Sequence, residues 1–297
     1  MPYAGSGEIS LYYEETGRGT PVLFVHEFAH DFRGWEMQVR YLSRFYRCIT
    51  FNARGYPPSD VPERDDLYGQ DLAVQDIGAV LDHLKLDRAC IVGFSMGAGT
   101  ALHFTMRHPE RVLALVFVGG GTGGNPDSRD SFIAAARRNA QIFLDEGMGS
   151  ATVQRMLSCD PTRIQLLHKD PRGFEEFRRQ LAEHSAAGSA LTMRNCQALR
   201  PPLSNFEAQL KATRVPTLIV AGDEDDPVIE TSLFLKRTMP AAGLLVMPKT
   251  GHAVNLEEPA AFNASVHDFL VAVEQRLWRE REAENGEPDK LDTQEQK

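Results

Sequence analysis

Short strand-like runs alternate with helix-like segments along most of the chain, and this alternation limits the possible folds more than any other feature. Runs rich in aliphatic and β-branched residues, with the length of buried strands, are Ile9–Tyr13, Val22–His26, Cys48–Asn52, Ala89–Gly93, Val112–Gly119, Thr217–Ala221 and Leu244–Met247. Segments with helical period lie between them: Trp35–Phe45, Asp71–Leu84, Ala98–His108 and Thr231–Met239. This alternation predicts an α/β fold, with a mostly parallel sheet covered by helices on both faces.

The alternation is interrupted once, between about residues 125 and 206. This region contains no strand-like run, only amphipathic helical segments: Ser131–Glu146, Thr152–Leu157 and Phe174–Ala187. We expect residues 1–124 and 207–278 to be the two parts of one α/β core, with residues 125–206 inserted between two core strands as a helical cap. Residues 279–297 are polar and lack an apolar face, which predicts a charged, disordered tail.

The charge balance favours a small-molecule partner. The formal net charge of -9 would repel nucleic acid and anionic lipid surfaces, so we expect neither as a partner. The N-terminus lacks the basic and then apolar pattern of a signal peptide, and no apolar run has the ~18 residues needed to span a bilayer. We therefore expect a cytoplasmic protein with no membrane partner. The sequence leaves its oligomeric state open.

Motifs for cofactors are missing from the sequence. No P-loop and no G-x-G-x-x-G follows a strand-like run, so we expect no nucleotide cofactor. The cysteines at positions 48, 90, 159 and 196 are scattered without C-x-x-C spacing, which favours reduced, structural thiols over a metal site. The sequence therefore predicts a protein that needs neither a cofactor nor a metal ion.

The pentapeptide Gly93-Phe94-Ser95-Met96-Gly97 carries the strongest chemical signal. It follows a strand-like run and opens a helix rich in small residues. A serine on a sharp strand-to-helix turn needs glycine on both sides, because a Cβ there would clash with neighbouring backbone. The turn lifts the hydroxyl out of the sheet, and the helix N-terminus stabilises negative charge beside it. We therefore predict that Ser95 is a catalytic nucleophile.

A serine nucleophile needs a base at neutral pH, and the chain has nine histidines that could supply it. His252 differs from the rest because it directly follows the run Leu244–Met247, and ligands meet open α/β sheets at the carboxyl ends of strands. We predict that His252 is the general base. The acid that orients it should follow another strand, between serine and histidine in chain order. The loop after Thr217–Ala221 offers four: Asp223, Glu224, Asp225 and Asp226.

Further motifs follow the other strand-like runs at matching places. In chain order they are His26-Glu27-Phe28, Asn52 to Ser59, Gly93 to Gly97, Gly222 to Asp225, and Gly251-His252. This order resembles the α/β-hydrolase superfamily over about residues 8 to 275. The segment His108-Pro109-Glu110-Arg111-Val112 and the helical cap look most like its enol-lactonase, carbon–carbon-bond hydrolase and cofactor-free haloperoxidase branches. The resemblance implies an eight-stranded sheet, and it is weakest in the cap.

The resemblance also implies roles that the local pattern leaves open. The family's acid is the last position of Gly-x-x-Asp, which implies that Asp225 orients His252. The family builds its oxyanion hole from two backbone N–H groups, and their positions here are Phe28 and Met96. Two fixed donors aimed at a developing oxyanion typically lower the barrier by several kcal/mol.

Three residues depart from the family pattern: Glu27 and Pro57 stand where glycine is usual, and Asn52 stands where aspartate is usual. A carboxylate facing an oxyanion hole would oppose the developing negative charge, so we expect Glu27 to turn away from the site and pair with Arg54. The alternative is that Glu27, together with His30, contacts a polar substrate or moves a proton.

Together these features predict a serine hydrolase that cleaves a small carboxylic ester, lactone or related acyl compound through a Ser95 acyl-enzyme. Two alternatives remain open. The same triad could catalyse carbon–carbon-bond hydrolysis or a lyase reaction, or the fold could serve as a ligand receptor without catalysis. The sequence does not indicate which substrate is bound.

Overall fold

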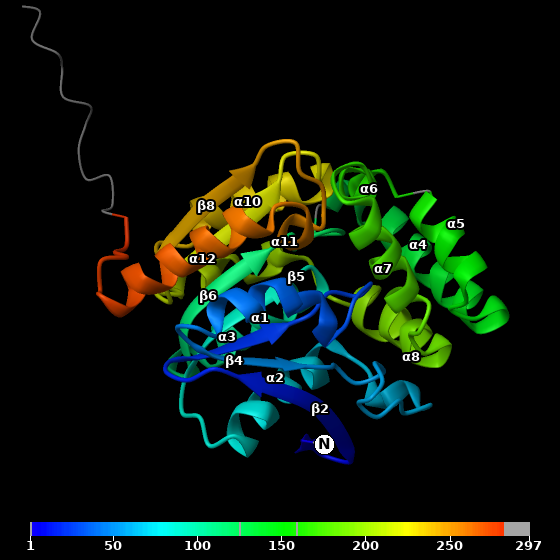
Figure 1. The fold of residues 1–297 in the computed structure, drawn as a ribbon, viewed down its shortest axis with the longest axis horizontal. Helices are drawn as coiled ribbons and strands as arrows, with labels where there is room; N and C mark the ends of the chain where they lie inside the picture. Colours follow the sequence, from blue (N-terminus) through cyan, green and yellow to red (C-terminus); the bar gives the residue numbers. More distant parts are fainter. Residues whose placement is uncertain (1, 125, 159, 282–297) are drawn as a thin grey trace, which may run out of the picture.

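The computed structural model describes residues 2–124, 126–158 and 160–281, and an eight-stranded sheet runs through its centre (Figure 1). The strands are β1 (Tyr3–Ser6), β2 (Ile9–Thr16), β3 (Pro21–Val25), β4 (Arg47–Phe51), β5 (Ala89–Phe94), β6 (Val112–Val118), β7 (Thr217–Gly222) and β8 (Ala242–Met247). Their order in the sheet is β1-β2-β4-β3-β5-β6-β7-β8. Only the β1–β2 and β2–β4 pairs are antiparallel. The predicted fold class, a mostly parallel eight-stranded sheet, is confirmed.

Helices cover both faces of the sheet, because its strands carry apolar side chains on both sides. Val22 and Phe24 of β3 belong to an apolar cluster on one face, and Leu23 and Val25 belong to a second cluster on the other. The first cluster is covered by α1 (Glu36–Leu42), α11 (Val254–Glu257) and α12 (Pro259–Glu274). The second is covered by α2 (Gln70–His83), α3 (Met96–Arg107), α9 (Glu207–Ala212) and α10 (Asp226–Thr238).

All the elements described between β6 and β7 are helical. They are α4 (Pro126–Glu146), α5 (Ser150–Ser158), the short helix η4 (Pro161–Arg163), α6 (Ile164–Lys169), α7 (Pro171–Leu181), α8 (Ala186–Leu191), the π-helical turn η5 (Thr192–Gln197), η6 (Leu203–Phe206) and α9. Helices α4 to α8 lie together at one end of the sheet (Figure 1). They share an apolar cluster that includes Phe143, Leu157 and Phe177 and that also contains Phe28 and Tyr56 from loops of the core. A cap with boundaries at residues 125 and 206 remains a prediction.

The direction of chain travel across the sheet reverses at β3. From β3 the chain runs through α1 to β4, then returns through α2 to β5 on the other side of β3. The loops that leave the carboxyl ends of β3 and β5 therefore turn toward opposite faces of the sheet. Open α/β sheets bind ligands in the crevice between two such loops. The segment His26–Phe28 follows β3 and Ser95 follows β5, so both motifs meet at this point.

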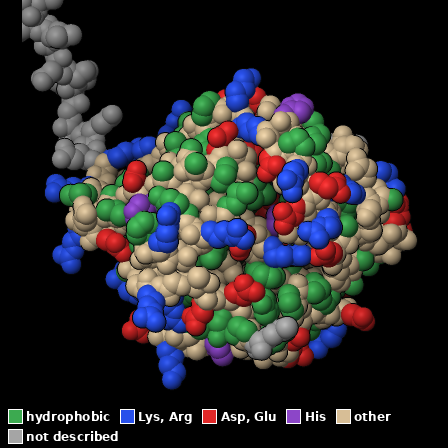
Figure 2. All heavy atoms as spheres, viewed as in Figure 1, with side chains coloured by type: hydrophobic (Ala, Val, Ile, Leu, Met, Phe, Trp, Pro, Cys, Tyr) green, Lys and Arg blue, Asp and Glu red, His purple; other side chains and the backbone are tan. Residues whose placement is uncertain are grey.

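Basic and acidic side chains are interspersed on the face drawn in Figure 2. No helix among the described residues is long and apolar enough to cross a membrane. Of the predicted tail, residues 282–297 lie outside the described residues. Arg281 donates its backbone N–H to the carbonyl of Pro240 at 3.0 Å, so the chain is still attached to the core at residue 281.

Candidate active site

Ser95 occupies a backbone conformation that few residues other than glycine adopt. Its φ of 51° and ψ of -107° mark the sharp turn between β5 and α3, and its N–H donates to the carbonyl of Val118 at 2.8 Å. A Cβ at Gly93 would lie 2.5 Å from the carbonyl oxygen of Gly97, so the turn requires glycine there. A Cβ at Gly97 would overlap the carbonyl oxygen of Val25. The start of α3 therefore packs directly on the end of β3.

Asp225 and His252 form a buried hydrogen-bonded pair. The Asp225 carboxylate lies 2.5 Å from Nδ1 of the imidazole, and the two residues follow the neighbouring strands β7 and β8. The other acids of the loop have different partners. Asp223 accepts the N–H of Thr250, and Glu224 pairs with Lys249. Asp225 is thus the member of the acidic cluster that contacts His252.

The charge environment favours the protonated form of His252. Burial alone would lower the pKa of this imidazole, but the charge of Asp225 and its hydrogen bond outweigh burial. Glu27 adds to the effect of Asp225, while Arg163 opposes it. The pKa of His252 is therefore raised above its ordinary value.

The loop that carries His252 is held from two sides. Glu257 on α11 accepts the N–H groups of Gly251 at 2.7 Å and of Ala253 at 3.2 Å, one residue before and one after the imidazole. The N–H of His252 itself donates to the carbonyl of Thr162 in η4 at 2.7 Å. A Cβ at Gly251 would overlap this same carbonyl, so glycine permits the close approach. Neither Glu257 nor Thr162 belongs to a motif that marks it in the sequence.

Ser95, Asp225 and His252 line one cavity of about 400 Å³. No hydrogen bond among the described residues joins the Ser95 hydroxyl to His252, although both side chains face this space. Catalytic hydrogen bonds are often long before a ligand binds, so this geometry is compatible with a nucleophile and its base. Phe28 and Arg163 also line the cavity.

Glu27 faces the cavity, which corrects the expectation that it turns away. It is only 1% exposed, and both of its carboxylate oxygens bind the guanidinium of Arg163, which is 5% exposed. Its carboxylate also lies 3.9 Å from Nε2 of His252. Burial acts to raise the pKa of Glu27, but the charges of Arg163 and His252 overcome it and lower that pKa. Glu27 is therefore an ionised, buried neighbour of the imidazole.

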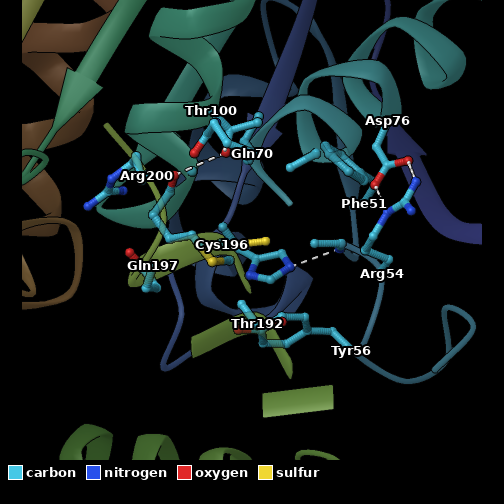
Figure 3. Close-up of a pocket in the computed structure, with 16 residues that line it drawn as sticks. Phe51, Arg54, Tyr56, Gln70, Asp76, Thr100, Thr192, Cys196, Gln197 and Arg200 are labelled. Carbon is cyan, nitrogen blue, oxygen red and sulfur yellow. Dashed lines mark hydrogen bonds and ion pairs between the residues drawn. The ribbon is translucent and has the colours of Figure 1, made fainter. Parts of the chain in front are cut away.

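Arg54 is not the partner of Glu27, so that expectation is wrong. Arg54 donates from Nε and Nη2 to the Asp76 carboxylate on α2, at 2.8 and 2.6 Å. Both side chains are buried, and they line a second, smaller cavity behind the site (Figure 3). The partner of Glu27 comes instead from η4, between β6 and β7, because η4 lies over the end of β3.

Phe28 and Met96 present backbone N–H groups near Ser95. Met96 is the first residue of α3, so its N–H has no acceptor within the helix. The N–H of Phe28 makes no hydrogen bond to any described residue. The ring of His26 fixes the loop that carries Phe28, because its Nδ1 donates to the Glu27 carbonyl at 2.6 Å and its Nε2 accepts the N–H of Ala53 at 3.0 Å.

His30 does not line the cavity that contains Ser95, which argues against the predicted substrate contact. Its ring packs 5.4 Å from the ring of Phe177 and lines a separate pocket with Arg33. Its Nδ1 accepts the N–H of Asp31 at 3.0 Å. Burial lowers the pKa of His30 despite the charge of Asp31, so the ring is a neutral part of the loop.

The side chain at position 52 acts as both donor and acceptor. Its amide nitrogen donates to the carbonyls of Tyr56 and Pro57 at 3.3 and 2.8 Å, and its oxygen accepts the N–H of Phe32 at 2.8 Å. An aspartate could accept from Phe32 but could not donate to either carbonyl. The contacts with Tyr56 and Pro57 therefore need the amide of Asn52.

None of the three described cysteines lines the cavity that contains Ser95. Cys48, Cys90 and Cys196 are free and buried, and burial raises the pKa of each thiol to about 12. Cys159 lies outside the described residues. Among the residues that are described, no group of three or more histidine, cysteine or acidic side chains could hold a metal ion.

Comparisons with known proteins agree with this architecture. The sequence model of the family described as alpha/beta hydrolase fold matches residues 20–259. The dihydrolipoyllysine-residue acetyltransferase component of the acetoin cleaving system of Pseudomonas putida is 31% identical over 275 residues, which span 89% of this chain and 67% of that one. The 2-hydroxy-6-oxononadienedioate/2-hydroxy-6-oxononatrienedioate hydrolase of Paraburkholderia xenovorans is 27% identical over 293 residues, spanning 90% and 92% of the two chains.

A solved structure is similar over nearly the whole chain. It is a thermophilic esterase from Thermogutta terrifontis with malate bound, and it superposes with a TM-score of 0.80 at 26% sequence identity. The superposition covers 92% of this chain and 98% of the esterase. This chain therefore has the same fold as a known esterase over nearly its whole length.

Proposed function

This chain belongs to the α/β-hydrolase family, and from that premise we propose that it hydrolyses a small carboxylic ester, lactone or related acyl compound through an acyl-enzyme on Ser95. The family and its esterase and hydrolase relatives make the chain an enzyme rather than a receptor. One observation carries the proposal. Asp225 binds Nδ1 of His252 at 2.5 Å, and the imidazole lines the same cavity as a serine on a strained turn.

The first half of the reaction forms the acyl-enzyme. The Ser95 Oγ attacks the carbonyl carbon of the substrate, and its proton passes to Nε2 of His252. Asp225 accepts a hydrogen bond from Nδ1–H of His252, which keeps Nε2 free to accept the serine proton and stabilises the imidazolium once it forms. The bond from the carbonyl carbon to the leaving oxygen then breaks, and that oxygen takes the proton from Nε2.

The second half releases the acid. A water molecule gives its proton to Nε2 of His252 while its oxygen attacks the acyl carbon, and the bond to Ser95 Oγ breaks as that oxygen recovers the proton. In both halves the backbone N–H groups of Phe28 and Met96 stabilise the negative charge on the carbonyl oxygen. Because the loop of Phe28 is fixed by His26, this donor needs no rearrangement before it acts.

Carbon–carbon-bond hydrolysis is the second candidate, and the position of Glu27 favours it. Glu27 and Asp225 both stabilise a proton on His252, so the ring is well suited to protonate a carbon leaving group. The Paraburkholderia relative carries the name of such a hydrolase. A lyase reaction would use the same protonated ring.

Labelling and turnover together test the proposal. A fluorophosphonate should label wild-type protein stoichiometrically at Ser95, and p-nitrophenyl acetate should give a burst of nitrophenol followed by steady turnover. Ser95→Ala should abolish both, while circular dichroism shows an unchanged fold, because the turn tolerates a small side chain. Labelling at another residue, or full activity in Ser95→Ala, would overturn the proposal. Product analysis with a ring-cleavage diketone distinguishes the two candidates.

A further inference from the structure

The charges that line the Ser95 cavity are paired with one exception. Arg163 is neutralised by Glu27 and also contacts Asp160 at 3.2 Å, while Asp225 binds His252. The remaining charged residue of the lining is Arg200. No carboxylate among the described residues lies within ion-pair distance of its guanidinium. The cavity therefore carries one positive charge that the protein leaves unbalanced.

Arg200 makes few polar contacts with the protein. Its Nη2 donates to the carbonyl of Thr122 at 3.2 Å, which uses one of the five N–H donors of a guanidinium. Burial, together with the nearby charge of Arg129, lowers the pKa of Arg200 to about 10. The side chain is still protonated at neutral pH, but a partly buried cation without a counter-ion is unfavourable. An anion bound in the cavity would relieve that cost.

Gln197 adds a second unpartnered polar group at the same place. Its side chain is only 7% exposed and lines the cavity, yet its amide makes no hydrogen bond to any described residue. It ends the π-helical turn η5, where the N–H of Ala198 reaches back to the carbonyl of Met193 at 2.9 Å. Such turns often occur at functional sites. Figure 3 shows Gln197 and Arg200 on one side of the smaller pocket, opposite Arg54.

The separation between Arg200 and Ser95 determines how long a ligand must be to contact both residues. A Cβ at Gly99 would lie 2.9 Å from Nη1 of Arg200, so the guanidinium rests on α3 where glycine leaves room for it. Gly99 is one helical turn beyond Ser95, and its N–H donates to the Ser95 carbonyl at 3.2 Å. One turn rises about 5–6 Å along the axis. A short chain of a few carbon atoms spans this length.

We propose that Arg200 and Gln197 form a subsite for a carboxylate of the substrate, so that this enzyme acts on acyl compounds with an anionic group a few carbons from the reacting carbonyl. The inference rests on the proposed function of Ser95. The guanidinium supplies charge and up to two parallel N–H donors, and the Gln197 amide supplies a further donor. Arg200 thus determines substrate choice and takes no part in bond breaking.

A matched pair of esters tests the subsite. Mono-p-nitrophenyl glutarate carries a terminal carboxylate, and p-nitrophenyl pentanoate has the same acyl length without charge. After the uncatalysed rates are subtracted, wild-type protein should prefer the glutarate. In Arg200→Met, the ratio of kcat/KM for glutarate to that for pentanoate should fall by about 10- to 100-fold, the loss expected for hydrogen bonds to a charged group. Arg200→Lys should retain part of the preference.

Arg194→Met is the matched control, because it removes the same charge from the same segment. Arg194 is exposed and pairs with Asp65 rather than facing the cavity. Its variant should keep the wild-type ratio. An unchanged ratio in Arg200→Met, or an equal loss in Arg194→Met, would overturn the inference while leaving the role of Ser95 intact.

Binding separates this inference from the proposed function. Glutarate itself should bind Ser95→Ala by titration calorimetry, and at least tenfold more weakly when Arg200→Met is added. This result supports the subsite even if neither ester is turned over, an outcome that would count against the proposed function alone. No binding of glutarate, or equal binding by both variants, refutes the subsite.

Discussion

The Glu27 carboxylate lies 3.9 Å from Nε2 of His252, on a ring whose Nδ1 is already bound to Asp225. The imidazole therefore has a carboxylate near each nitrogen, and Arg163 has a larger, opposing effect on its pKa than Glu27 has. Asp225 is the main group that stabilises the imidazolium, and Glu27 adds to its effect. A general base must lose that proton before it can accept one from Ser95, so Glu27 links the activity of the enzyme to pH.

The first prediction concerns the acid limb of the rate profile. Because the pKa of His252 is raised, kcat/KM on p-nitrophenyl acetate should increase through an apparent pKa above the ~6.5 of an ordinary imidazole. Glu27→Gln removes one carboxylate and should move this limb to lower pH. Asp160→Asn is the control, since Asp160 contacts Arg163 but makes no contact with His252. A limb that does not move in Glu27→Gln contradicts the prediction.

The second prediction concerns the acid that orients the base. Asp225→Asn should keep the fold but lower kcat by about 10⁴-fold, because the amide favours the wrong tautomer and cannot stabilise the imidazolium. The matched variant Asp226→Asn changes the next residue, which begins α10, and should retain most of the turnover. Steady-state kinetics of the two proteins decide between them. Greater sensitivity at Asp226 would show that the acid has been misassigned.

The third prediction concerns the buried ion pair. Glu27→Gly introduces the residue usual in the family, yet it should lower the free energy of unfolding by about 3 kcal/mol, because Arg163 loses its main partner while buried. The double variant Glu27→Gln, Arg163→Met should recover much of that loss. Urea unfolding measures both. In contrast, Glu175→Gln breaks the exposed pair with Arg178 and should leave the unfolding midpoint nearly unchanged.

The same pair should make stability depend on pH in acid. The pKa of Glu27 is lowered in the folded state, so its contribution is present above the ~4.3 of an unfolded glutamate and is lost as pH falls through the folded value. Wild-type protein should therefore lose more stability than the double variant on going to acid below pH 4.3. Equal pH dependence of the two proteins would refute this assignment.

The fourth prediction concerns position 52. Asn52→Asp restores the residue usual in the family, but it should destabilise the protein by about 1–3 kcal/mol, because the carbonyls of Tyr56 and Pro57 lose their donor and face a carboxylate. The same chemical change at exposed Asn205 should alter the free energy of unfolding by less than about 0.5 kcal/mol. Thermal unfolding of both variants checks the difference.

Most of the sheet could be predicted from the sequence, because β3 to β7 are buried on both faces and appear as continuous apolar runs. The runs found by pattern coincide with β2 to β8. The exception is β1, whose residues Tyr3–Ser6 include a glycine and a serine and carry little apolar signal. Helix α3 begins at Met96 rather than Ala98, because the glycine-flanked turn ends at the nucleophile itself. Local pattern does not mark that boundary.

The site could be predicted only where its residues follow strand ends. Ser95 and His252 stand directly after apolar runs, but the pairing of Glu27 with Arg163 joins residues 136 positions apart and has no local signature. The sequence does contain one indication that Arg54 has a partner other than Glu27. Asp76 lies on the apolar stripe of α2, between residues that pack against the sheet, and a buried acid there requires a cation. In the structure Arg54 meets this requirement, and Glu27 therefore has another partner.

The hydrogen bond from the His252 backbone to the carbonyl of Thr162 bears on how this enzyme could have diverged from its relatives. Insertions between β6 and β7 are the natural place for a hydrolase to acquire new selectivity, since exchanging them leaves the sheet untouched. Here the inserted segment also holds the backbone of the histidine, through a contact that only Gly251 permits. A chimera that carries the segment between β6 and β7 from another hydrolase would keep the sheet but lose the hydrogen bond between His252 and Thr162. A change in this segment would therefore alter the lining of the cavity and the position of His252 at the same time.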